Sequence, residues 1–171
     1  KLLNFTQPYT AKAPTAEQKA NMRRAKILLM GDSWTQGGSA STLGSFFYSA
    51  LTDLGGYFEL VGMNKYPTPE LDEHYIRHCG GGGWTVEKWQ TAYNNNIKDK
   101  IDYDIAIIHI GLNDGYGDSD VELYAQRYDK LMADVFADHP GAIVYLVSVH
   151  EGELNPAYTA QLSEKVKLTA E

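Results

Sequence analysis

The chain has 171 residues, of which 43% are hydrophobic and 22% charged, and this is ordinary for one globular domain with its own core. Its net charge of -7 disfavours nucleic acid and anionic membrane as partners. No apolar run approaches the roughly 18 residues that a membrane-spanning helix requires. The one cysteine, Cys79, cannot form a disulfide within the chain.

Predicted elements alternate between strand and helix along most of the chain. Residues 1–25 contain Pro8 and Pro14 and show no strong period, so we expect an arm that wraps the domain, with a short helix from Thr15 to Arg24. From residue 26 onward, short apolar runs typical of buried strands alternate with segments of helical periodicity. The expected strands are Lys26–Met30, Tyr57–Gly62, Asp104–Ile110 and Ala142–Val149, and the expected helices cover residues 43–54, 85–100, 119–136 and 156–170.

Local signals refine this pattern. Residues 119–122 have the spacing of a capping box, and Asn155-Pro156 is typical of an N-cap followed by the first helical residue. The stretch from Met63 to Gly83 has two prolines and four consecutive glycines, which predicts an irregular loop. Continuous apolar strands that alternate with helices indicate a parallel sheet covered on both faces. We therefore predict an α/β fold, a three-layer α/β/α sandwich, with residues 26–171 as one domain.

Three short motifs follow predicted strands. Gly31-Asp32-Ser33 follows the first strand, Gly82-Gly83-Trp84-Thr85 closes the loop after the second, and Gly111-Leu112-Asn113-Asp114 follows the third. In a parallel α/β sheet the ligand crevice lies beyond the carboxyl ends of the strands. The three motifs are therefore expected to meet at one edge of the sheet and to form a single site.

The residue types suit attack on an ester. Ser33 is a candidate nucleophile, while the backbone N–H of Gly83, the side-chain amide of Asn113 and the N–H of Ser33 itself can donate to the oxyanion that forms. Simpler roles remain open for each motif: Asp-Ser often caps a helix, Gly83 can serve a tight turn, and Asn113 can be an ordinary turn residue. Trp34, Trp84 and Trp89 are candidates to flank the site or to pack inward.

Together these motifs resemble the first three sequence blocks of the SGNH (GDSL-type) hydrolases, from about Lys26 to the end of the chain. Within that superfamily, Gly82–Thr85 and His109–Asp114 are most similar to the acetyl esterases of carbohydrate esterase family three. The resemblance implies a flavodoxin-like sandwich with Ser33 as nucleophile, and an oxyanion hole from the backbone of Ser33 and Gly83 and the side chain of Asn113. It also implies a small acyl ester as substrate, such as acetyl groups on xylan or other sugars.

The fourth block of that superfamily, an Asp-x-x-His whose histidine is the general base, does not follow the fourth predicted strand. We therefore expect that these residues lack the last strand and its base, which a separate C-terminal segment would supply, and that Leu162 and Val166 are exposed. Of the five histidines, His150 lies at the correct edge of the sheet and is the alternative base. His139 lies at the wrong edge, His109 inside a strand, and His74 and His78 in the long loop.

The sequence thus predicts a serine esterase that removes acetyl groups from carbohydrate through an acyl-enzyme at Ser33. The alternatives are a lipid or aryl esterase of the same superfamily, and a non-catalytic carbohydrate-binding relative that has lost the base. We expect no metal, because no His/Cys/Asp/Glu cluster has ligand spacing, and no cofactor, because Gly80–Gly83 lacks the Lys-Ser/Thr of a phosphate-binding loop. We expect a secreted protein, although no signal peptide can be read from a chain that opens on Lys1.

Overall fold

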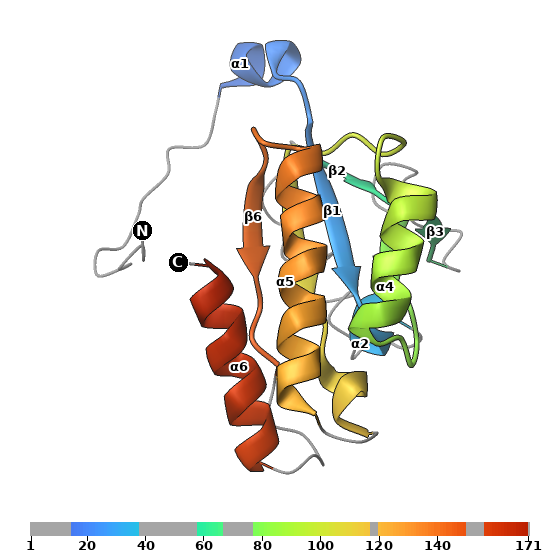
Figure 1. Ribbon diagram of the computed structural model, residues 1–171. Helices are drawn as coiled ribbons and strands as arrows, with labels where there is room; N and C mark the ends of the chain where they lie inside the picture. Colours follow the sequence, from blue (N-terminus) through green and yellow to red (C-terminus); the bar gives the residue numbers. More distant parts are fainter. Residues whose placement is uncertain (1–14, 38–57, 67–76, 117–119, 150–155, 171) are drawn as a thin grey trace.

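A central sheet with helices packed on it forms the described part of the chain (Figure 1). The structure is a computed structural model, and it describes residues 15–37, 58–66, 77–116, 120–149 and 156–170. The strands are β1 (Ala25–Gly31), β2 (Phe58–Val61), β3 (Asn64–Lys65), β4 (Arg77–Gly80), β5 (Ile105–His109) and β6 (Ile143–Leu146). The helices are α1 (Ala16–Asn21), α2 (Ser33–Gln36), α4 (Val86–Ala92), the π-helix η2 (Tyr93–Ile97), the 3-10 helix η3 (Leu112–Tyr116), α5 (Val121–Asp138) and α6 (Pro156–Ala170).

Strand β1 is the centre of the sheet, whose order is β3-β4-β1-β5-β6, with β2 also paired to β1. Strand β1 runs parallel to β2, β4 and β5, and β5 runs parallel to β6. The antiparallel pair β3 and β4 is added at one side. The four predicted strands are all present within a few residues of their expected bounds, and they are parallel as predicted.

The prediction of an irregular loop from Met63 to Gly83 is wrong, because this stretch contains β3 and β4. Strand β4 has the sequence Arg-His-Cys-Gly and so lacks the continuous apolar run that marks a buried strand. Its strand conformation depends on pairing with the end of β1, where Cys79 lies opposite Met30 and Gly80 opposite Gly31. Local sequence cannot show such a pairing.

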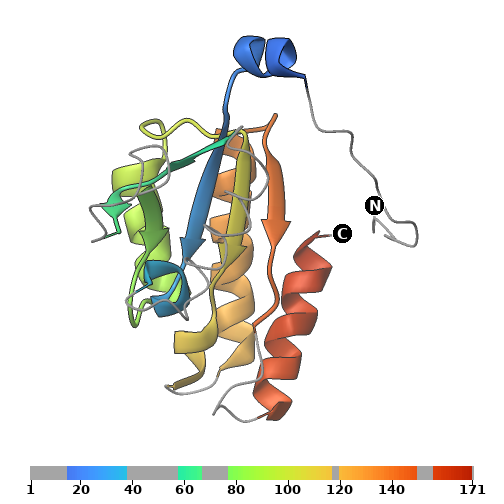
Figure 2. The ribbon, with the colours of Figure 1, turned by 180° about the vertical axis from the view of Figure 1, so that it is seen from behind.

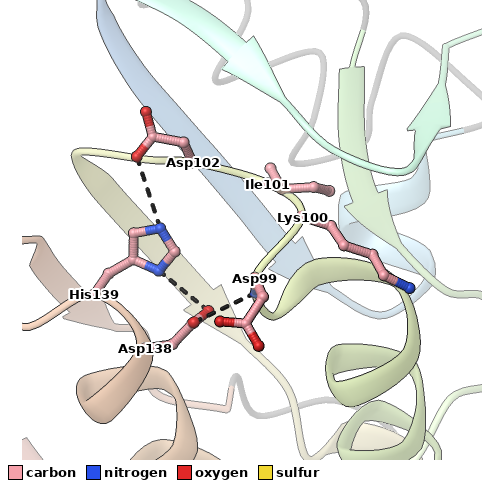
Figure 3. A pocket seen from close by; sticks show the side chains of 6 residues that line it. All are labelled: Asp99, Lys100, Ile101, Asp102, Asp138 and His139. Carbon is pink, nitrogen blue, oxygen red and sulfur yellow. Dashed lines mark hydrogen bonds and ion pairs between the residues drawn. The ribbon is translucent and has the colours of Figure 1, made fainter.

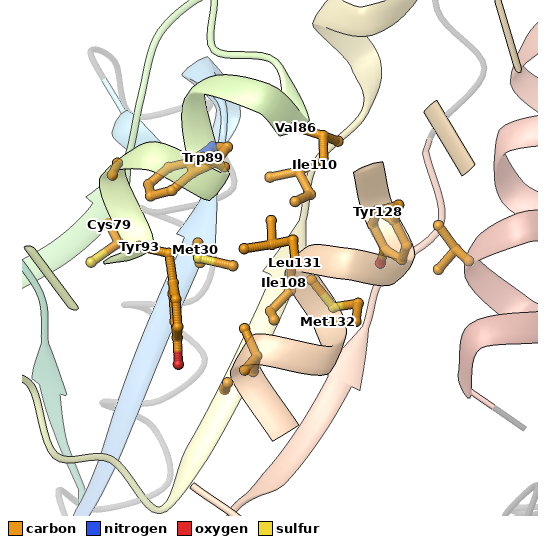
Figure 4. Packing of buried hydrophobic residues seen from close by; sticks show 14 of the residues in the cluster. Met30, Cys79, Val86, Trp89, Tyr93, Ile108, Ile110, Tyr128, Leu131 and Met132 are labelled. Carbon is orange, nitrogen blue, oxygen red and sulfur yellow. The ribbon is translucent and has the colours of Figure 1, made fainter. Parts of the chain in front are cut away.

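Both faces of the sheet are buried at the central strand β1, whereas Ile143 and Tyr145 of β6 are exposed. On one face, Leu28 and Met30 pack into the main core with side chains of α4, α5 and α6 (Figure 4). On the opposite face, Ile27 and Leu29 form a second cluster with residues of β2, and their exposed fractions are only 5% and 1%. The views in Figures 1 and 2 show α4 and α5 on the same side of the strands. This burial agrees with the predicted sandwich, and the predicted helix 43–54 lies outside the described residues.

The helix boundaries follow their capping residues. Thr85 caps α4 by accepting from the backbone N–H of Lys88. The helix continues as the π-helix η2 from Tyr93 and ends at Ile97, three residues before the predicted end at Lys100. Asp120, and not Ser119, caps α5, because its carboxylate accepts from the backbone N–H of Leu123 at 3.0 Å. Pro156 is the first residue of α6, as predicted. None of the helices in these described segments is long and apolar enough to cross a bilayer.

The expected exposure of Leu162 and Val166 on α6 is wrong. Their exposed fractions are 0% and 2%, because α6 packs along α5 and completes the main core. By contrast, Leu168 on the same helix is 56% exposed. Helix α6 is therefore an integral part of the domain core.

We expect Leu162→Ala to lower the free energy of unfolding by about 2–5 kcal/mol, since it leaves a cavity between α6 and the core. The matched control is Leu168→Ala, an exposed leucine on the same helix, for which the change stays within about 0.5 kcal/mol. Urea unfolding of the three chains measures both values. Equal losses in the two variants would show that α6 does not pack as described.

Candidate active site

The nucleophile candidate Ser33 follows the end of the central strand. Gly31 closes β1, and the buried Asp32 caps the short helix α2 by accepting from the backbone N–H of Trp34 at 2.9 Å. Ser33 is the first residue of that helix and is exposed. The capping role considered for this motif is therefore real but belongs to Asp32. It leaves Ser33 accessible at the carboxyl edge of the sheet.

The turn that carries Ser33 is packed tightly onto the sheet. A Cβ on Gly80 would overlap the backbone of Gln36, and a Cβ on Gly31 would overlap the side chain of Thr35. The hydroxyl of Tyr66 donates to the backbone carbonyl of Thr35 at 2.9 Å. The two glycines let α2 lie directly on the ends of β1 and β4, so the backbone beside Ser33 has little freedom to move.

Gly83 lies in a tight turn directly after β4. The backbone N–H of Gly81 donates to the carbonyl of Gly31 at 2.9 Å, and the N–H of Trp84 donates to the carbonyl of Gly81 at 3.1 Å. Gly83 is the third residue of this turn, and its φ of +71° is a conformation that favours glycine. No atom outside Gly83 and its two chain neighbours lies within 4 Å of the position where its Cβ would stand, and the residue is exposed. The turn thus presents backbone to open space next to β1.

Asn113 lies in η3, immediately beyond β5, and its side chain is half-buried. Its Nδ2 donates to the backbone carbonyl of Trp84 at 3.1 Å. This bond connects η3 to the end of the turn formed by residues 81–84, which we call the glycine turn. A side-chain amide carries two N–H donors, and this bond uses one of them. The bond fixes the orientation of the amide and leaves the second N–H for another acceptor.

The structure therefore places all three predicted site residues at the carboxyl edge of the sheet. Ser33 follows β1, Gly83 follows β4 and Asn113 follows β5, and β4 and β5 are the neighbours of β1 on its two sides. The prediction that Gly83 merely closes a loop after the second strand is corrected, since it follows a strand of its own. This arrangement places an exposed hydroxyl between two strand ends that carry N–H donors, which suits the oxyanion-stabilising part of acyl transfer from an ester.

The three tryptophans have different positions. Trp34, next to Ser33, is 40% exposed, and Trp84 is half-buried. Trp89 is fully buried in the main core, with its ring centroid 4.9 Å from that of Trp84. Trp89 is therefore a packing residue and does not flank the site, because helical periodicity directs it at the sheet.

Asp114 is a site neighbour whose role the sequence reading left unassigned. Both of its carboxylate oxygens accept from the backbone N–H of Val86, at 3.1 and 3.2 Å. Burial raises the pKa of Asp114 to about 6, which the bond from Val86 and the charge of Arg127 only partly oppose. The sequence signal that could have pointed to Asp114 was its position directly after Asn113 in the third motif.

This raised pKa predicts a pH dependence of stability. The folded chain binds a proton at Asp114 more tightly than the unfolded chain does, so stability falls as pH rises from about 4 to about 6. We expect Asp114→Asn to remove this part of the dependence, which amounts to about 3 kcal/mol. Urea unfolding of both chains across this pH range measures it. The same pH dependence in both chains would contradict the assignment.

None of the three described histidines is an exposed residue at the carboxyl edge of the sheet: His78 and His109 are buried, and His139 lies at the opposite edge. His78 is buried in strand β4 and not in a loop as expected, and its Nδ1 accepts from the N–H of Gly80 at 2.9 Å. Burial lowers the pKa of His78 to about 4, so its ring is neutral near pH 7. His109 is buried at the end of β5, and His139 lies after α5 at the amino edge of the sheet, both as predicted. His74 and His150 lie outside the described residues.

A hollow of about 300 Å³ lies at the opposite, amino edge of the sheet (Figure 3). There His139 lies 3.2 Å from the carboxylate of Asp138 and 3.8 Å from that of Asp102, and it stacks on Tyr103. In the described segments, no group of three or more His, Cys, Asp or Glu side chains is arranged to hold a metal ion. This hollow is separate from the edge that carries Ser33.

Solved structures support this reading of the fold. The chain is 24% identical to the Clostridium thermocellum family 3 carbohydrate esterase, with a TM-score of 0.69 over 86% of this chain and 73% of that one. It is also 24% identical to a carbohydrate esterase family 3 from Talaromyces cellulolyticus, with a TM-score of 0.53 over 70% of this chain and 59% of that one. The lipase/acylhydrolase from Enterococcus faecalis is 18% identical, with a TM-score of 0.58 over 87% and 71%.

These similarities, together with the family match given below, confirm the predicted SGNH-type α/β fold. The match to the Talaromyces esterase spans less than two thirds of that protein. None of the curated proteins matches the chain in sequence. The sequence profile of the GDSL-like Lipase/Acylhydrolase family matches residues 29–171, which include all three motifs. The chain therefore belongs to the GDSL-like lipase/acylhydrolase family.

Proposed function

We propose that the protein is a serine esterase that removes small acyl groups, above all acetyl groups, from carbohydrate. The observation that carries this proposal is the exposed Ser33 at the end of β1, with Gly83 and Asn113 on the neighbouring strands' ends. Membership in a family of ester-cleaving hydrolases supports the reaction type. The family 3 carbohydrate esterases among the similar structures support the acetylated-sugar substrate.

In the proposed reaction, the Ser33 hydroxyl attacks the ester carbonyl and gives its proton to a general base. The carbonyl oxygen becomes an oxyanion, which the free N–H of the Asn113 amide and the backbone N–H groups of Gly83 and Ser33 stabilise. The bond to the sugar oxygen then breaks, and the sugar leaves with the proton from the base. Water hydrolyses the acyl-enzyme by the same steps and restores Ser33.

Two sources are proposed for the base. His150 follows β6, whose carboxyl end lies at the same edge of the sheet as Ser33. The second source is an Asp-x-x-His segment of the kind that the family resemblance implies, which the 171 residues do not contain. His78 and His109 are buried, and His139 lies at the opposite edge, so we assign the base to none of these three. Loss of activity in His150→Ala would identify His150 as the base.

A series of esters tests the substrate class. We expect kcat/KM for 4-nitrophenyl acetate to exceed that for the octanoate by at least about tenfold, together with release of acetate from acetylated xylan. The reverse order of the two esters would favour a lipid esterase. Saccharide binding without turnover of any ester would favour the non-catalytic relative and would overturn the proposal.

A further inference from the structure

The glycine turn and the start of α4 are attached to η3 by two neighbouring residues. Asn113 donates to the backbone carbonyl of Trp84, and Asp114 accepts from the backbone N–H of Val86 with both oxygens. Trp84 and Val86 lie on either side of Thr85, the N-cap of α4. The junction between turn and helix is thus held to η3 from both ends.

The rest of the glycine turn has few restraints of its own. One bond joins Gly81 to Gly31, one closes the turn between Trp84 and Gly81, and Gly83 has no side chain to pack. Gly83 lies only three residues before Val86, so any movement of Val86 is passed on to it through a short stretch of chain. The bonds from η3 therefore set where the Gly83 N–H lies relative to the Asn113 amide.

Asp114 is well placed to provide this restraint. Among charged side chains, Arg127 of α5 lowers the pKa of Asp114 and Glu87 of α4 raises it. The charge of Asp114 in turn raises the pKa of Tyr124 of α5 and of Tyr158 of α6. Arg127 forms its own ion pair with Glu87, with N and O 3.1 Å apart. Both oxygens of the Asp114 side chain accept from the backbone N–H of Val86 in α4, and this commits the carboxylate to the junction.

We propose that Asp114 is a positioning residue of the oxyanion hole, which ties the start of α4 to η3 and so fixes the Gly83 N–H relative to the Asn113 amide. The inference rests on the proposed function, because it assumes that these two groups receive the oxyanion. Asp114 acts through its neighbours and does not touch the ester. A donor displaced by about 1 Å can cost about 10²-fold in rate.

The test compares Asp114→Ala with Asp120→Ala. Asp120 provides the matched control, since its carboxylate also accepts from the backbone at the start of a helix, on α5 and outside the glycine turn. Asp120→Ala removes one such bond and Asp114→Ala removes the contacts of both oxygens with the N–H of Val86, so the Tm of each variant is measured to show that it is folded. For 4-nitrophenyl acetate, we expect Asp114→Ala to lower kcat per folded molecule by about 10²-fold with KM nearly unchanged. Asp120→Ala should leave both constants within about twofold of the parent.

Rescue by the conservative variant adds a second measurement. Asp114→Asn keeps one oxygen that can accept from Val86, and we expect it to recover kcat to within about tenfold of the parent. The rate at which a fluorophosphonate labels Ser33 should follow the same order, because this reaction also develops charge in the oxyanion hole.

Different outcomes separate the two proposals. The proposed function, and this inference with it, would be overturned if the parent chain, supplied with its general base, neither hydrolysed the ester nor reacted with the fluorophosphonate. Two results with an active parent would overturn the inference alone. One is a loss of kcat below about threefold in Asp114→Ala, and the other is a loss of kcat in Asp120→Ala as large as the loss in Asp114→Ala.

Discussion

Replacing Ser33 by alanine is expected to abolish esterase turnover, with kcat reduced by about 10⁴–10⁶-fold, because the covalent acyl-enzyme can no longer form. The effect on stability should be small, since Ser33 is exposed and Asp32 provides the cap of α2. The measurement is initial-rate kinetics with 4-nitrophenyl acetate on the parent and the variant, with thermal unfolding as the check that both chains are folded.

Active-site labelling gives an independent readout of the same residue. A fluorophosphonate should modify Ser33 in the parent and leave Ser33→Ala unmodified, provided that the general base is present. Ser163→Ala is the control, because Ser163 is half-buried on α6 and its hydroxyl donates to the carbonyl of Val149. Labelling that persists in Ser33→Ala and disappears in Ser163→Ala would overturn the choice of nucleophile.

Replacing Asn113 by alanine is expected to lower kcat by about 10²–10³-fold, or about 2.7–4 kcal/mol of transition-state stabilisation. KM for a small acetyl ester should change little, because the amide acts mainly on charge that develops during attack. The substitution also removes the bond from Nδ2 to the carbonyl of Trp84, so kcat must be expressed per folded molecule.

Asn64 provides the matched control for this experiment. Its Nδ2 also donates to a backbone carbonyl, that of Gly80, at 3.0 Å, and its side chain is also half-buried. Asn64→Ala should therefore cost about 1 kcal/mol of stability, as loss of such a bond does, without the large loss of kcat. If kcat in Asn113→Ala stays within about threefold of the parent, Asn113 is an ordinary turn residue and the oxyanion hole is wrong.

Much of the fold was predictable from the sequence, because strong local patterns carried it. The apolar runs that became β1, β2, β5 and β6 are long enough to mark buried strands, and the period of α5 marks an amphipathic helix. The three motifs could be assigned to one edge because parallel strands bring their carboxyl ends together. Ser33, Gly83 and Asn113 were predicted as site residues in this way.

The remaining features depend on contacts between residues far apart in the chain. Strand β4 exists because Gly80 pairs with Gly31, and this contact brings the glycine turn to the strand end that carries Ser33. His78 is neutral and buried only because of that strand, and Leu162 is buried only because α6 meets α5.

The sequence by itself determined which residues can carry the chemistry, since residue type and motif spacing are local properties. Only the tertiary structure decided how they are held. The bond from Asn113 to Trp84 and the bonds from Val86 to Asp114 cross 29 and 28 positions of sequence, and no local pattern encodes such a distance. Hydrogen bonds of this kind depend on how η3 and α4 pack against the same sheet, and this packing is a property of the whole domain.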